Sequence, residues 1–263
     1  MMLPFDSEPL LTVKNGGSII QTPFSNGRMK NTPAEIHDLQ TPDRILATAE
    51  EMFAEQGYWG VSLRSITRTS GVNIAAIHYH FGSKQELIEK IFEKRCGPMN
   101  QERMRLLAEC RVAPDRPPLL EQILEAYLRP SLIWPNDPDG ARRFLRLRAV
   151  LSHEHETLAA DLISKHFNEV SRTFVSALVD VLPDFSEEEV YWRFQFLLAA
   201  QYYTLSNPGR IVILSEGRCD PSDGEASLRH MVPFCAAVFR APVPAPNALV
   251  FGPSTPIDLA RVG

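Results

Sequence analysis

Residues 62–84 read SLRSITRTSGVNIAAIHYHFGSK and decide how the rest of the chain is interpreted. Ser62 can cap a short helix, and the pair Ser70-Gly71 is typical of the turn that ends it. A second short helix follows and ends at Gly82, and its apolar anchors are Val72, Ile74, Ile77 and Phe81. Two short helices joined by a glycine-containing turn form the helix-turn-helix pattern.

Helix signals continue on both sides of this segment. Thr41-Pro42 combines a capping hydroxyl with a proline at the first helical position, and Gly57 is expected to end that helix. Ser83 and Glu86 have the spacing of a capping box, which predicts a further helix that Pro98 kinks or interrupts. The 21 prolines of the chain leave residues 43–97 free, as a helical domain requires.

Farther along the chain the apolar periodicity is again helical. We expect helices over 118–132, 140–152, 156–182, 186–206 and 223–240. The strand-like run Ile211–Leu214 has no partner strand, so we interpret it as the buried end of a helical turn. The chain is predicted to be all-α, with a disordered arm (1–40), a three-helix helix-turn-helix head (41–88), a larger helical ligand-binding and dimerisation body (89–241) and a loose C-terminal tail (242–263). Translation could also begin at Met29.

Composition describes an ordinary soluble chain of 263 residues, with 44% hydrophobic residues, 22% charged residues and a net charge of −5. Four widely spaced cysteines argue against a disulfide scaffold or a zinc module. We find no secretory signal and no apolar run long enough to cross a membrane. These features predict a cytoplasmic protein that does not contact membranes.

The second helix of the motif carries small and hydrogen-bonding residues on its expected outer face. Small residues allow a helix to enter the major groove, and Asn and His can contact base edges and phosphates. Arg64 and Lys84 flank the same surface as cations that can meet phosphates. Asn73 is as well suited to capping the second helix as to contacting DNA. The candidates on this helix are Asn73, Ala75, Ala76, His78, Tyr79 and His80.

Charge tests this interpretation, because non-specific DNA affinity grows with the number of phosphates that are neutralised. Residues 41–95 hold seven Lys/Arg and seven Asp/Glu, so the head as a whole is neutral. Residues 56–85, in contrast, hold three cations, Arg64, Arg68 and Lys84, and no acid. The acids therefore belong to flanking helices that can face away from DNA.

The run from Thr41 to Leu87 resembles the TetR family of bacterial transcriptional repressors over about 50 residues without a gap, since the apolar anchors, the glycines, the His80-Phe81 pair and Lys84 all fall in register. The segment from Asn73 to Lys84 looks more like the subgroup that includes fatty-acid-responsive regulators. Position 78 departs from the family, where tyrosine is common, so Tyr79 is the alternative phosphate contact. The resemblance implies a homodimer that binds a palindromic double-stranded DNA operator and is released by a small apolar or acidic effector. It assigns the DNA contacts to Arg64, Ile74, Ala75, Ala76, His78, Tyr79, His80 and Lys84, to which we add Ser62.

The body should contain a ligand cavity and a subunit interface. Helix 186–206 is apolar around almost its whole circumference, so it needs burial on two sides. One of three arginines, Arg143, Arg146 or Arg148, could pair with a carboxylate ligand. The predicted ligand-binding residues are Tyr127, Phe144, Leu147, Leu151, Phe174, Phe194, Leu198 and Tyr202. The interface is predicted from the family's four-helix bundle at Trp192, Phe196, Ala199, Ala200, Tyr203, Leu228, Met231 and Val232.

Other functions have weaker support in the sequence. His153 and His155 are two residues apart and point away from each other on a helix, which favours a loop or a helix start over a metal site. The catalytic motifs HExxH and GxSxG are absent, so we expect no enzyme, no cofactor and no metal. A helical protein-interaction module and an enzyme without a recognisable signature are the alternatives.

Overall fold

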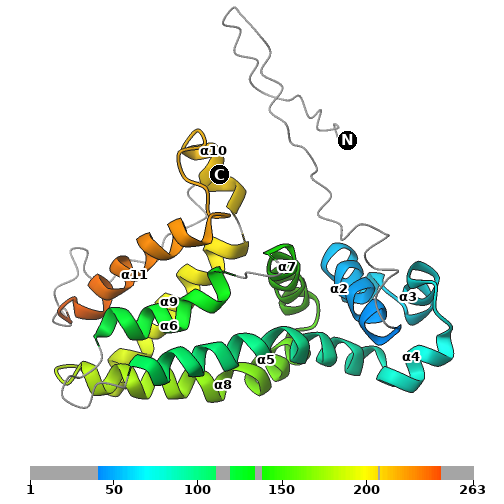
Figure 1. The fold of residues 1–263 in the computed structure, drawn as a ribbon, viewed down its shortest axis with the longest axis horizontal. Helices are drawn as coiled ribbons and strands as arrows, with labels where there is room; N and C mark the ends of the chain where they lie inside the picture. The colour runs from blue at the N-terminus through cyan, green and yellow to red at the C-terminus, as the bar shows by residue number, and fades with distance from the viewer. Residues whose placement is uncertain (1–40, 111–118, 134–137, 207, 244–263) are drawn as a thin grey trace, which may run out of the picture.

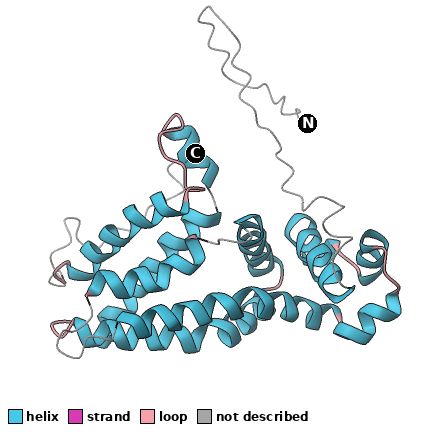
Figure 2. Cartoon of the chain, viewed as in Figure 1, coloured by secondary structure: helices cyan, strands magenta, loops and turns pink. Residues whose placement is uncertain are grey.

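The computed structural model describes residues 41–110, 119–133, 138–206 and 208–243. The predicted arm (1–40) and nearly all of the predicted tail (242–263) lie outside these ranges. Within them the chain forms helices joined by loops and turns, without a strand (Figure 2). The prediction of an all-α fold is therefore confirmed. None of the described helices is both long and apolar enough to cross a membrane.

The first three described helices form the head: α2 (Thr41–Gly60), α3 (Leu63–Ser70) and α4 (Ile74–Phe81). Helical geometry in α2 breaks at Gly57, whose φ of 78° suits a residue without a side chain. This confirms the predicted helix end at Gly57. Gly71 ends α3 in the left-handed conformation with φ 68° and ψ 24°, as the turn of the motif requires.

Helix α5 (Lys84–Cys110) leads from the head into the body as one helix of 27 residues. The capping box that opens it is present, since Glu86 N donates to Ser83 Oγ at 3.1 Å and Ser83 N donates to Glu86 Oε2 at 3.0 Å. The prediction that Pro98 interrupts this helix was wrong. Buried residues on both sides of the proline, Cys96 and Met99, hold the helix in the core, so packing outweighs the one lost hydrogen bond.

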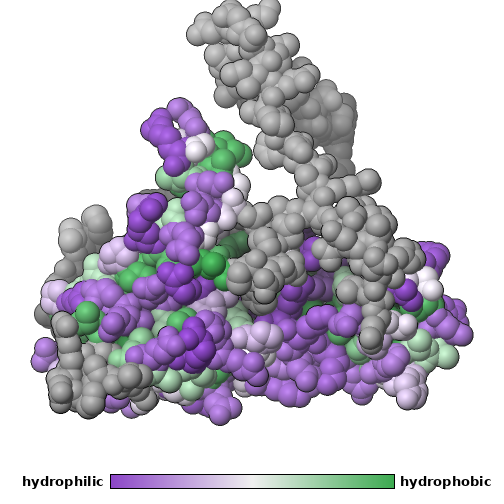
Figure 3. All heavy atoms as spheres, viewed as in Figure 1, coloured by the Kyte–Doolittle hydropathy of each residue, from purple (hydrophilic) through white to green (hydrophobic). Residues whose placement is uncertain are grey.

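The body contains α6 (Leu120–Leu132), α7 (Pro138–Glu154), α8 (Glu156–Val181), α9 (Glu187–Ser206), α10 (Pro208–Leu214) and α11 (Gly224–Arg240). The long helices predicted in this region are all confirmed. Residues 211–214 are helical as expected but they are not buried, because Ile213 is 66% and Leu214 is 73% exposed. Figure 3 shows hydrophobic surface on α10, where this helix projects from the body. That part of the prediction was wrong, since α10 touches little besides α9.

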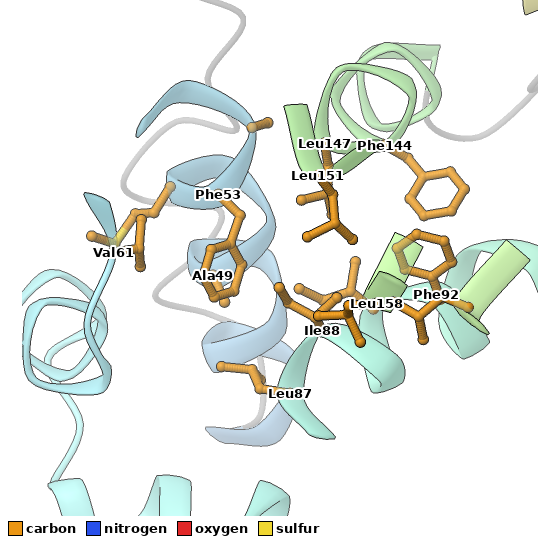
Figure 4. Packing of buried hydrophobic residues seen from close by; sticks show 14 of the residues in the cluster. Ala49, Phe53, Val61, Leu87, Ile88, Phe92, Phe144, Leu147, Leu151 and Leu158 are labelled. Atoms are coloured by element: carbon orange, nitrogen blue, oxygen red, sulfur yellow. The ribbon is translucent and has the colours of Figure 1, made fainter. Parts of the chain in front are cut away.

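Figure 1 shows α5 and α8 running side by side along the molecule, with the head at one end and α6, α9 and α11 at the other. Helix α7 lies between them and packs on α2 of the head. One hydrophobic core joins α2, α5, α7 and α8, and Figure 4 shows Phe53, Ile88 and Leu151 from three of these helices packed together in it. A second core fills the space between α6, α8, α9 and α11. The head is thus fixed to the body by a shared core.

Candidate nucleic-acid interface and cavity

Two side chains of the motif hold the ends of its helices. Ser62 Oγ accepts a hydrogen bond from Ser65 N at 3.0 Å and caps α3, as predicted. Asn73 Oδ1 accepts from Ala75 N at 2.9 Å and caps α4. Of the two roles that the sequence left open for Asn73, the structure displays the capping role.

Most of the predicted DNA-facing side chains of α4 are exposed. Tyr79 is 85% exposed, Ile74 is 37% exposed, and Ala75, His78 and His80 are exposed as well. Ala76 is half-buried and packs against the head core. Ile77 and Phe81 are buried and anchor the helix, so α4 presents a definite outer face.

The polar rings on this face are partly engaged in local contacts. The Nδ1 of His78 donates to the carbonyl oxygen of Gly82 at 2.9 Å, which leaves Nε2 as its outward nitrogen. The rings of Tyr79 and His80 meet edge to face with centroids 4.9 Å apart. The most accessible of these groups is thus the Tyr79 ring with its hydroxyl.

The two flanking cations have different surroundings. Arg64 is exposed on α3, and so is Arg68, which the sequence analysis counted as a cation but did not select as a site residue. Lys84 is half-buried: its ammonium donates to the Tyr58 carbonyl and lies 4.0 Å from the centroid of the Tyr58 ring. Partial burial lowers the pKa of Lys84, although the Glu154 carboxylate opposes this effect.

That carboxylate joins the body to the head. Glu154, at the end of α7, accepts hydrogen bonds from Tyr58 N at 2.6 Å and from Trp59 N at 3.3 Å. The indole Nε1 of Trp59 donates to the Glu154 carbonyl oxygen at 3.1 Å. The ring of His155 stacks on Trp59 with centroids 5.6 Å apart and planes 11° apart. We call these residues (Tyr58, Trp59, Glu154 and His155) the α2–α7 junction.

The junction also explains the segment 153–155. His155 lies between α7 and α8 with non-helical angles of φ −148° and ψ 69°, so the predicted loop or helix start is confirmed for this residue. His153 instead lies in the last turn of α7. Among the described residues no three His, Cys, Asp or Glu side chains are placed to hold a metal ion. The sequence did not predict the junction, because nothing local to Trp59 indicates that a residue 95 positions away would contact it.

The body contains a cavity of about 540 Å³ between α5, α6, α7, α8 and α9. Five of the predicted ligand-binding residues line it, namely Tyr127, Phe144, Phe194, Leu198 and Tyr202. Leu147 and Leu151 instead face the core shared with the head, and Phe174 is fully buried behind Tyr127. Helix α7 therefore contributes Phe144 to the cavity wall and Leu147 and Leu151 to the core that it shares with the head.

Two arginines also line the cavity, Arg103 from α5 and Arg148 from α7. Arg148 was one of three arginines that the sequence offered for a carboxylate, whereas Arg103 was missed because only residues after 118 were considered. Arg103 shares the buried stripe of α5 with Met99 and Leu107 at helical spacing. A charged residue within such a stripe is the signal that could have found it.

The predicted interface residues also divide between two environments. Trp192, Phe196 and Tyr203 are each more than half exposed on α9. Leu228 and Met231 are buried in the core of their own subunit, and Val232 packs against it. Ala199 lines the cavity, and Ala200 is half-buried. The exposed aromatic residue of α11 is Phe234, which is 59% exposed. It was not among the predicted interface residues.

Comparison with known proteins gives matches in both parts of the chain. Residues 45–91 match the family model described as bacterial regulatory proteins, tetR family, and residues 125–238 match the one described as tetracyclin repressor-like, C-terminal domain. The HTH-type transcriptional dual regulator CecR of Shigella flexneri is 34% identical over 105 residues, which cover 37% of this chain and 46% of that protein. The match thus spans less than half of that relative's length.

Solved structures resemble this fold over a larger share of the chain. A TetR-family transcriptional regulator from Bordetella parapertussis 12822 has a TM-score of 0.56 at 16% identity, covering 74% of this chain and 93% of that one. The fatty acid degradation regulator FadR from Bacillus halodurans has a TM-score of 0.51 at 15% identity, covering 76% and 94%. At these identities the likeness concerns the fold.

Proposed function

Because this chain belongs to the TetR family of transcriptional regulators, a family of DNA-binding proteins without enzymatic activity, we propose that it is a repressor that binds a palindromic operator and is released by a small effector. The exposed face of α4 supports this proposal. Tyr79 is an aromatic residue of α4 that is 85% exposed, and Arg64 and Arg68 are exposed on α3, in a stretch that holds no acid between residues 56 and 85. A motif that exposes a large ring together with cations suits a partner with phosphates.

In this proposal α4 enters the major groove. Arg64 and Tyr79 contact phosphates, while Ala75, His78 and His80 approach base edges. Ser62 and Asn73 act mainly by capping the helices that carry these groups, and Ile74 and Ala76 form the apolar part of the face. Lys84 contributes charge at the edge of the surface and holds Tyr58 in place.

A palindromic operator requires two heads, so we propose a homodimer. The exposed aromatic residues of α9 and α11 support it, since an apolar stripe of this kind needs a partner. Trp192 and Phe196 stack with centroids 6.3 Å apart and form its centre. Two heads would then enter successive major grooves about 34–36 Å apart.

Release by an effector requires that the cavity and the head be coupled. Helix α7 supports such coupling because it contacts both: Phe144 and Arg148 line the cavity, and Glu154 ends the same helix in the α2–α7 junction. If α7 can adopt two placements relative to the body, an effector that binds one placement more tightly shifts the population toward it and so moves the head. Small apolar and acidic molecules both remain within this proposal.

Two finer points are also proposals. We place the protein in the cytoplasm, where an operator is accessible. The subgroup that contains fatty-acid-responsive repressors stays a prediction, because the 15% identity to the fatty acid degradation regulator concerns the fold alone.

A gel shift with the region upstream of the protein's own gene tests the proposed function. We expect specific retention that an unrelated fragment does not compete away, and loss of retention when Tyr79 is replaced by Ala. The absence of retention even at low salt would contradict the proposal and favour an interaction module that uses the same face for protein.

A further inference from the structure

The cavity in the body contains positive charge that the protein itself does not neutralise. Arg103 is 2% exposed, and Arg148 has a buried Nε without a hydrogen-bond partner. Arg103 donates to the Tyr127 carbonyl at 2.8 Å and to Asn100 at 3.3 Å, both neutral acceptors. The contacts of the Arg148 guanidinium are with the faces of Phe167, 4.8 Å away, and Tyr202, 5.9 Å away.

Groups that could supply a negative charge are absent from the described lining. The lining residues include no Asp and no Glu. Cys96, which lies near both arginines, stays a neutral thiol because burial raises its pKa to about 12. Burial lowers the pKa of Arg103, and the like charge of Arg148 lowers it further. A buried guanidinium without a counter-charge is costly to the protein, so such groups mark places where an anion binds.

Apolar side chains form much of the rest of the wall. Phe144, Phe167, Phe194 and Leu198 line it, and its volume of about 540 Å³ lies in the range of small-molecule sites. The other polar side chains of the lining are uncharged: Gln201 donates to Ser131 Oγ, Asn168 donates to Ser164 Oγ, and the lining also includes Ser171 and Gln195. The cavity therefore combines an apolar space with a cationic end.

We infer that the effector is an organic anion, with an apolar body and one oxyanion group that accepts hydrogen bonds from Arg148 beside the charge of Arg103. This inference rests on the proposed function for its regulatory meaning, and it narrows the effector from apolar or acidic molecules to acidic ones. A guanidinium fork pairs with carboxylate and with phosphate, so both head groups share the required chemistry.

Calorimetric titration with matched probes tests the inference. The probes are 2-naphthoate against 2-naphthamide and octanoate against octanamide, so that each pair differs in charge at nearly constant shape. Octyl phosphate distinguishes the two head groups, and the tighter of octanoate and octyl phosphate identifies the one that the site prefers. We expect an acid to bind at least about ten-fold more tightly than its amide, since charge-assisted hydrogen bonds are roughly twice as strong as neutral ones.

The same titrations with variants assign the preference to the cavity. Arg148→Gln should remove the preference for the acid. Should the glutamine variant fail to fold, Arg148→Lys serves in its place: it keeps the charge but loses the guanidinium fork, so it should remove part of the preference. Arg146→Gln is the matched control, because Arg146 is exposed on the same helix. Equal binding of acid and amide, a preference that survives Arg148→Gln, or binding of none of the probes would overturn the inference.

Operator retention by the same preparation, measured without any probe, separates this inference from the proposed function. Retention without a preference for acids contradicts only the inference. Loss of retention with the preference intact contradicts the repressor and leaves an anion-binding cavity.

Discussion

Arg64 and Lys84 carry the same charge at the edge of one surface, but their different surroundings imply different roles. The guanidinium of Arg64 is exposed, whereas the ammonium of Lys84 donates to the Tyr58 carbonyl and lies over the Tyr58 ring. Removing the first should affect DNA affinity, and removing the second should also affect the stability of the head. The difference follows from burial and could not be predicted from the sequence, where both residues are simply cations in register.

Replacing Lys84 tests its structural contribution. Lys84→Met loses one charged hydrogen bond at a half-exposed site, for which we expect a loss of about 1 kcal/mol. For a chain of this size that loss lowers Tm by about 2–4 °C in a thermal melt. Arg64→Met is the control and should melt like the unsubstituted protein; equal Tm values for all three proteins would show that the Tyr58 contact contributes nothing.

Cysteine reactivity checks the burial of the two cores. The thiolate is the reactive form, and burial raises the pKa of Cys96 to about 12 and that of Cys235 to about 11. Cys219 is exposed. At pH 7.5 a maleimide should label Cys219 in the folded protein and reach Cys96 and Cys235 only after unfolding, as peptide mass spectrometry would record. Rapid labelling of Cys96 in the folded protein would contradict the packing described for α5.

At the scale of helices, local signals predicted most of the elements, and tertiary contacts account for the exceptions. The capping residues Ser62 and Ser83, Gly57 within α2 and Gly71 after α3 act within a few residues, so the sequence is enough to place those ends. Pro98 failed as a helix breaker because distant helices hold α5 on both sides of it. The orientation of Arg103 and the α2–α7 junction depend on pairs of residues far apart in the chain, which no local pattern encodes.

The α2–α7 junction makes a prediction for Glu154. Glu154→Ala removes the acceptor of two backbone amides, those of Tyr58 and Trp59. These amides should then exchange hydrogen for deuterium faster than in the unsubstituted protein, because unpaired amides open to water. Exchange measured by mass spectrometry over peptides spanning 57–61 reports this directly.

Glu156→Ala is the control, since this carboxylate is exposed two residues farther on. It should leave exchange in 57–61 unchanged. If Glu154→Ala also leaves it unchanged, the junction does not hold the head, and the proposed coupling through α7 loses its support.

For the whole molecule, the exposed rings of α9 and α11 predict a dimer, and a charge introduced among these rings should dissociate it. Phe196→Glu places a carboxylate in the centre of the proposed interface, where burial without a partner is costly. We expect the mass measured by size exclusion with light scattering to fall from two chains to one at micromolar concentration. Tyr79→Glu makes the same exchange of an exposed ring for a carboxylate in the head and should leave the mass at two chains. A dimer that persists in the Phe196 variant would place the interface elsewhere.

The central claim is that the face formed by α3 and α4 lies against duplex phosphates. Its most direct test is the salt dependence of operator affinity, measured by fluorescence anisotropy for the unsubstituted protein and for Arg64→Ala. Each phosphate that a cation neutralises contributes about 0.9 to the slope of log K against log salt concentration. The proposed dimer carries Arg64 in both heads, so the variant should show a slope smaller by about 1.8 and weaker binding on every sequence. An unchanged slope for Arg64→Ala, with unchanged affinity, would contradict the claim.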